Sequence, residues 1–148
     1  MIKEGKCPAG MNPANKRVVF DSYAILELLE DGPGARMVAD LLADSGERVQ
    51  IYLSEISLGE VYYILLRRHG VKAAEEVVEY IQLEESLSLA TADWQRIKKA
   101  AEYKAEGGLS YADCFVPALA FDEEAAIVTG DPEIIKAAEV NELAVIAI

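Results

Sequence analysis

The chain has 148 residues, 52% of them hydrophobic, and a formal net charge of −12. This size and apolar content fit one globular domain with its own core, which argues against disordered and disulfide-stapled classes. No apolar run approaches the roughly 20 residues that cross a bilayer, so no membrane span is predicted. The acidic balance argues against a polyanion as the default partner and suits a basic protein.

Residues 1–15 lack the apolar centre of a signal peptide, and their charged residues, proline and glycine predict a flexible leader. Residues 16–148 are then expected to form a single domain. Cys7 and Cys114 make no CxxC pair and have no histidine nearby. A zinc site is therefore not expected, and a reducing cytoplasm is the simplest compartment.

Beyond the leader, short apolar runs rich in β-formers alternate with longer segments of helical periodicity. The predicted strands are 17–20, 50–53, 87–89, 126–129 and 144–148. The predicted helices are 22–30, 35–44, 57–68, 71–83, 91–105, 110–121 and 132–140. This alternation predicts an α/β fold, a three-layer α/β/α sandwich with a central, mostly parallel sheet. In such sheets ligands bind outside the C-terminal ends of the strands.

Four acidic residues stand at these strand ends and helix starts. Asp21 and Asp131 come just after apolar strands. Glu60 and Asp113 are expected in the first turns of their helices, each three residues after a serine, as in a capping box. Taken singly, each acid has a structural explanation, because a helix cap is common and contributes about 1 kcal/mol.

Taken together, the four acids point to chemistry as well. Carboxylates gathered at one edge of a sheet cannot all stay ionised without a counter-charge. Oxygen ligands in a chain with a single histidine favour Mg²⁺ or Mn²⁺ over zinc. One or two such ions can activate a water and stabilise charge on a phosphoryl group. The constellation therefore predicts hydrolysis of phosphodiester bonds.

Four segments of the chain resemble, in order and approximate spacing, the signature blocks of PIN domains, and most closely those of VapC-type toxins. The segments are 18–22, 60–62, 109–114 and 127–131. The resemblance runs from about residue 18 to the C-terminus. It implies a Mg²⁺- or Mn²⁺-dependent endoribonuclease that is usually homodimeric, acts on RNA and is often silenced by a VapB-like antitoxin.

The resemblance also implies roles for individual residues. Asp21, Glu60 and Asp113 would hold the main metal ion. Asp131 would complete the acidic pocket, or help to position a second ion or the attacking water.

Three further residues have supporting roles by the same resemblance. Thr129 would orient the neighbouring acids, Ser22 is a weaker supporting candidate, and Glu133 stands where many relatives carry an additional acid. Pro117 departs from the pattern, because relatives usually have a small residue there. Its ring should clash with the carbonyl of Asp113, so a kink could re-aim that acid or the helix could absorb it.

Other prominent side chains have structural interpretations. His69 stands at a predicted helix end, which is more typical of a C-terminal cation than of a catalytic base. Hydrolases with a histidine base are therefore not favoured. Tyr62, Tyr63 and Trp94 are interpreted as packing residues rather than base-stacking platforms.

Two alternative functions remain open from the sequence. A non-catalytic PIN-like module could hold RNA or a protein partner, which would suit the acidic charge. A receiver-like or phosphatase-like domain also places acids and a threonine at strand ends. Residues 21–23 fit neither pattern, because the receiver needs adjacent acids and the phosphatase an Asp-x-Asp motif.

Overall fold

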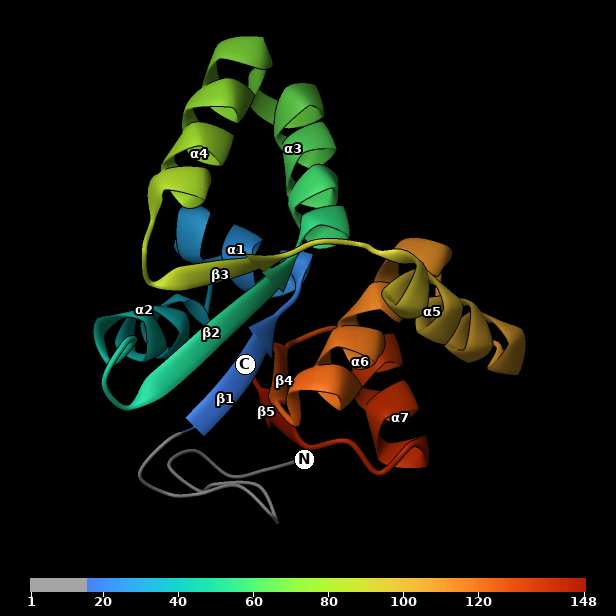
Figure 1. Ribbon diagram of the computed structural model, residues 1–148. Helices are drawn as coiled ribbons and strands as arrows, with labels where there is room; N and C mark the ends of the chain where they lie inside the picture. Colours follow the sequence, from blue (N-terminus) through green and yellow to red (C-terminus); the bar gives the residue numbers. More distant parts are fainter. Residues whose placement is uncertain (1–15) are drawn as a thin grey trace.

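The computed structural model describes residues 16–148, so the leader predicted at 1–15 lies outside the described part of the chain. Five strands form one sheet in the order β3-β2-β1-β4-β5, and each neighbouring pair is parallel. The strands are β1 (Lys16–Phe20), β2 (Val49–Ser54), β3 (Leu87–Ala90), β4 (Ala126–Thr129) and β5 (Val145–Ala147). The first strand within residues 16–148, β1, is thus the central strand of the sheet (Figure 1).

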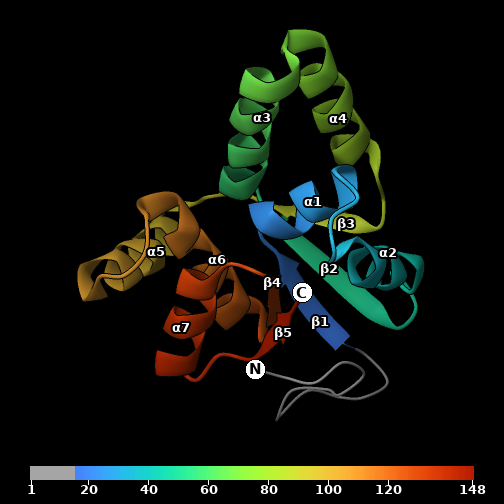
Figure 2. The ribbon, with the colours of Figure 1, turned by 180° about the vertical axis from the view of Figure 1, so that it is seen from behind.

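Helices cover both faces of this sheet. They are α1 (Ser22–Leu29), α2 (Ala35–Ala43), α3 (Glu55–His69), α4 (Val71–Leu83), α5 (Trp94–Glu106), α6 (Tyr111–Glu123) and α7 (Pro132–Val140). The first four pack on one face and the last three on the other (Figures 1 and 2). The predicted three-layer α/β/α sandwich is confirmed, and the sheet is parallel throughout its five strands.

The central strand shows why both layers are needed. Val18 and Phe20 point into the core on the α1–α4 side, whereas Val19 points into the core under α5, α6 and α7. All three side chains are fully buried. Successive side chains of a strand alternate between faces, so an unbroken apolar run is stable only where both faces are covered.

Helix α3 begins at Glu55 and not at residue 57, because Ser54 caps it by accepting a hydrogen bond from the Ile56 amide at 3.1 Å. The expectation that Glu60 lies in the first helical turn is therefore wrong, and so is the capping box proposed for it. Serine directly after a strand was the available signal for the true cap. Helices α3 and α4 then leave the layers together as a hairpin (Figures 1 and 2).

Three local expectations have mixed outcomes. Pro117 lies inside α6, which continues on both sides of it, so the helix absorbs the proline. Trp94 and Tyr63 are 68% and 49% exposed, so neither packs into the core of this chain. Tyr62 does pack against the core and donates a hydrogen bond to Glu75.

Within residues 16–148, no helix is long and apolar enough to cross a membrane.

Candidate active site

The acids meet at the edge of the sheet where β1 and β4 end. These strands are parallel neighbours, and Phe20 is paired with Val128. The residues that follow each strand therefore leave the sheet side by side. Helices α1 and α7 begin at this edge, capped by Asp21 and Asp131 respectively.

Asp21 is the most deeply buried of the acids, with 2% of its surface exposed. One carboxylate oxygen accepts a hydrogen bond from the Ala24 amide at 2.9 Å, and the other accepts one from the Thr129 hydroxyl. The pKa of Asp21 is raised to about 7, chiefly because the carboxyl group is buried; the two hydrogen bonds oppose the shift, and the charges of Asp131 and Asp113 add to it.

Thr129 connects the two strand ends. Its fully buried hydroxyl donates to Asp21 and accepts a hydrogen bond from the Asp131 amide at 3.0 Å. One side chain thus fixes the orientation of a carboxylate on β1 and the backbone that carries the next carboxylate. Sequence spacing could suggest a threonine near the acids, but not which acid it contacts.

Glu60 reaches the same edge from the second turn of α3. The Ser22 hydroxyl donates a hydrogen bond to its Oε1 atom at 2.7 Å, so α1 positions this acid. Burial raises the pKa of the half-buried Glu60 carboxyl, Ser22 opposes the shift, and the charges of Asp113 and Asp131 add to it.

Asp113 is in the first turn of α6, whose N-cap is Ser110. The Ser110 hydroxyl accepts a hydrogen bond from the Asp113 amide at 3.2 Å. Burial raises the pKa of Asp113, the Ser110 contact lowers it, and the charges of Asp131 and Glu133 raise it. Pro117 therefore leaves this acid within electrostatic range of the others.

Asp131 serves as a helix cap in addition to facing the other acids. Its Oδ1 atom accepts a hydrogen bond from the Glu133 amide at 2.9 Å, and Pro132 occupies the first helical position. The capping explanation is therefore correct for Asp21 and Asp131, and it does not compete with a shared site. Each of Asp21, Glu60 and Asp113 has its pKa raised by at least one other acid.

Among residues 16–148, no three His, Cys, Asp or Glu side chains converge as a preformed metal-binding group. Hydrogen bonds direct Asp21 toward Thr129 and Glu60 toward Ser22. The donor set nevertheless fits a hard divalent cation, because it consists of carboxylate oxygens whose charges repel one another. A bound cation would remove that repulsion and favour the ionised carboxylates.

The sequence model of the PIN domain family matches residues 18–140. This chain belongs to the PIN domain family. No protein among those with curated sequences is significantly similar to this PIN domain.

Solved structures share its fold. The VapC20 toxin of Mycobacterium tuberculosis, described as cleaving the sarcin–ricin loop, has a TM-score of 0.68 at 20% identity, over 81% of this chain and 94% of that one. VapBC2 from Rickettsia felis, bound to a promoter DNA fragment, has a TM-score of 0.69 at 14% identity, over 89% of this chain and 98% of that one. A toxin–antitoxin complex from Klebsiella pneumoniae has a TM-score of 0.56 at 16% identity, over 77% of this chain and 86% of that one. These TM-scores establish a common fold.

Proposed function

We propose that this PIN domain is a Mg²⁺- or Mn²⁺-dependent endoribonuclease that hydrolyses RNA phosphodiester bonds, and that it is the toxin of a VapBC-type pair. The observation that carries the proposal is that Asp21, Glu60, Asp113 and Asp131 lie within electrostatic range of one another at one edge of the sheet. The fold it shares with a toxin described as cleaving the sarcin–ricin loop supports the same reading.

In this proposal Asp21, Glu60 and Asp113 hold the divalent ion, and Asp131 completes the acidic pocket. The chemistry that such an ion supplies when bound is activation of a water and stabilisation of charge on a phosphoryl group. Thr129 and Ser22 hold two of the carboxylates in place through their hydroxyl groups. Positioning of this kind strengthens a metal site, because it fixes each ligand before the ion arrives.

The hydrogen bonds also give the acids different roles in this proposal. Asp21 is buried and accepts a hydrogen bond at each of its carboxylate oxygens, so its position is fixed. Asp131 is partly exposed and lies next to Glu133 at the start of α7. Asp131 and Glu133 are therefore the acids best placed to orient a water that enters from solvent.

The partners we propose are an RNA substrate, a basic VapB-like antitoxin and a second copy of this chain. The net charge of −12 supports a basic partner protein. Large apolar side chains on α4 support an assembled state, since Tyr80, Leu83 and Val71 are 69%, 73% and 65% exposed. Cys114 is a buried free thiol, which suits the reducing cytoplasm that we propose as the compartment.

The test is Mn²⁺ or Mg²⁺ binding by calorimetry on the wild type and on Asp113→Asn, followed by RNA cleavage with the same two samples. We expect wild-type protein to bind the ion and cut RNA, and the variant to lose both. A wild type that binds no ion and cuts no RNA would overturn the proposal. RNA or protein binding that persists in Asp113→Asn without any turnover in either protein would identify the non-catalytic module instead.

A further inference from the structure

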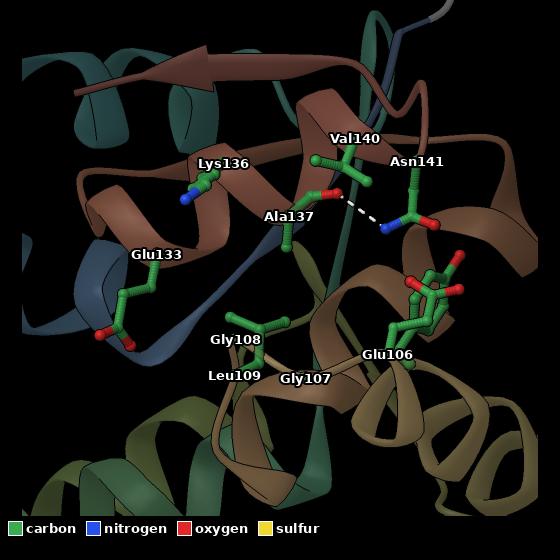
Figure 3. A pocket seen from close by; sticks show the side chains of 10 residues that line it. Glu106, Gly107, Gly108, Leu109, Glu133, Lys136, Ala137, Val140 and Asn141 are labelled. Atoms are coloured by element: carbon green, nitrogen blue, oxygen red, sulfur yellow. Dashed lines mark hydrogen bonds between the residues drawn. The ribbon is translucent and has the colours of Figure 1, made fainter.

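A cavity of about 510 Å³ lies between helix α7 and the turn that joins α5 to α6. Figure 3 shows these two walls, with Glu133 and Lys136 on one side and residues 106–109 on the other. Glu133 lines the cavity and also acts electrostatically on Asp113. The cavity therefore begins at the edge of the acid cluster.

The inner surface of this cavity is apolar. Tyr103 and Leu109 are almost fully buried beneath it, at 6% and 4% exposure. Ala137 and Val140 line the α7 side, and Val140 remains 71% exposed. An apolar surface of this kind, open to solvent beside a polar site, suits the faces of a flat aromatic ring.

The opposite wall contains two consecutive glycines. Gly107 and Gly108 have φ angles of 88° and 91°, which other residues rarely adopt. A Cβ atom at either position would meet no protein atom within 4 Å, so the space beside the turn is open. Lys104 donates a hydrogen bond to the Leu109 carbonyl at 2.8 Å and holds the turn in place.

Polar groups stand around the apolar surface. The Asn141 amide nitrogen donates one hydrogen bond to the Ala137 carbonyl at 2.8 Å (Figure 3), and its Oδ1 atom can accept one from a ligand. Glu106 and Glu133 supply further acceptors, and Lys136 supplies a donor. A fitting ligand must therefore present several N–H groups and at least one acceptor.

Guanine fits this description because its Watson–Crick edge presents more N–H groups than that of adenine, cytosine or uracil. Its Watson–Crick edge carries an N1–H and an N2 amino group beside the O6 acceptor, whereas uracil has a single N–H between two carbonyl groups. Carboxylates accept from base N–H groups, and lysine donates to O6. The cavity volume also falls within the usual range for small-ligand sites, roughly 300–1,000 Å³.

We infer that the cavity between α7 and the α5–α6 turn is a base-recognition subsite, which binds a guanine next to the phosphodiester bond that the acid cluster cuts. The inference rests on the proposed ribonuclease function. Lys136 and Val140 are its specificity-determining residues, and they select the base without joining the acid cluster.

The first experiment measures nucleotide binding without any reaction. Guanosine and uridine 5′-monophosphate are titrated into the full chain by calorimetry. We expect guanosine monophosphate to bind roughly tenfold more tightly, as one good base contact discriminates. Val140→Trp, which fills the cavity from an exposed position, should abolish the difference, and Lys136→Ala should reduce it. Lys72→Ala, an exposed lysine of α4, is the matched control and should leave it unchanged.

Equal binding of the two nucleotides by the wild type, or a preference that survives Val140→Trp, would overturn the subsite. Circular dichroism of each variant separates lost binding from lost folding.

The second experiment maps cleavage sites on RNAs of defined sequence with Mn²⁺. We expect the wild type to cut beside guanine, and Val140→Trp to cut with that preference lost. Unchanged cleavage sites in Val140→Trp would overturn the subsite and leave the nuclease intact. A wild type that cuts no RNA would overturn the proposed function, and the nucleotide titration would then decide the subsite alone.

Discussion

The β1–α1 and β4–α7 junctions share one local design and differ in their surroundings. Each has a buried apolar strand followed by an aspartate that caps the next helix. Asp21 is 2% exposed and accepts hydrogen bonds at both oxygens, whereas Asp131 is partly exposed. The same sequence signal therefore yields a buried anchor at one junction and a solvent-facing acid at the other.

The contacts at the two strand ends differ. At the end of β1, the Ala24 amide of α1 and the Thr129 hydroxyl of β4 both donate hydrogen bonds to Asp21. At the second junction Gly130 precedes Asp131 and lets the Tyr23 ring and the Ile148 carbonyl approach the backbone. A capping motif thus fixes a backbone turn, and the surrounding contacts decide how deeply its carboxyl group is buried.

The largest expected effect comes from removing the charge at the buried junction. In the proposed nuclease, Asp21→Asn should lower RNA cleavage on the order of 1,000-fold, because a bound metal contributes several kcal/mol to catalysis. The same change should raise the Tm of the metal-free protein at pH 7 by several degrees, since burial of an ionised carboxylate is unfavourable.

Asp131→Asn is the matched comparison for that experiment. Asparagine caps helices as well as aspartate, so the Tm should stay near the wild-type value, and cleavage should fall less than in Asp21→Asn. Thermal unfolding and RNA cleavage measure both variants. Equal Tm changes in the two variants would contradict the contrast between the junctions.

The pH dependence of stability follows from the same shift. The pKa of Asp21 is about 7 in the folded chain and near its ordinary value of 3.8 when unfolded, so between these values the folded state binds more protons. The stability of the metal-free protein should therefore decrease as pH rises from about 4 to about 7, and change little above that. Denaturant unfolding across this range measures the slope.

Asp21→Asn is the control, because the unfolding free energy of this variant should depend much less on pH. The raised pKa values of Glu60 and Asp113 act in the same direction and should leave a remainder. If the unfolding free energy of the wild type instead rises between pH 5 and pH 7, burial of the ionised Asp21 carboxylate does not destabilise the folded state.

Thr129→Val tests the link between the junctions. The change removes the hydroxyl that donates to Asp21 and accepts from the Asp131 amide, so the buried carboxylate and the part-buried amide each lose a partner. We expect a loss of about 1–3 kcal/mol in unfolding free energy and roughly a 10- to 100-fold loss of cleavage. Thr129→Ser keeps the hydroxyl and should restore most of the activity, which a purely volume-based effect would not do.

Gly130→Ala should disturb the β4–α7 junction by steric contact alone. A Cβ there would lie 2.8 Å from the Ile148 carbonyl oxygen and would also clash with the Tyr23 ring. We expect a destabilisation of about 1–3 kcal/mol in denaturant unfolding. Gly59→Ala is the matched control, because its Cβ would meet nothing within 4 Å in helix α3, and it should stabilise by roughly 0.5–1 kcal/mol.

Sequence patterns predicted the order of strands and helices because those signals are local. Apolar strands such as 126–129 and caps such as Asp131 lie within a few residues of the structure they specify. The predicted start of α3 was wrong because two serines, Ser54 and Ser57, both suit an N-cap. Ser54, at the buried end of β2, is the one that caps the helix. Helix α5 likewise begins at Trp94, because Asp93 caps it.

The geometry of the candidate site was less accessible from sequence, because its contacts are distant along the chain. Thr129 and Asp21 are 108 positions apart, and Ser22 and Glu60 are 38 apart. No periodicity identifies such pairs, and none predicts that burial brings the pKa of Asp21 to about 7. The cavity beside Glu133 is equally hidden, since its walls come from α5, α7 and the turn between α5 and α6.

The central place of β1 also bears on how this protein is made. Synthesis runs from the N-terminus, so Asp21 leaves the ribosome long before β4, the strand that pairs with β1 and supplies Thr129. Until then the nascent chain lacks both Thr129 and the fourth acid. On the proposed function, a growing chain is therefore harmless to the message that encodes it, and the translating cell has that interval in which to produce an inhibitor.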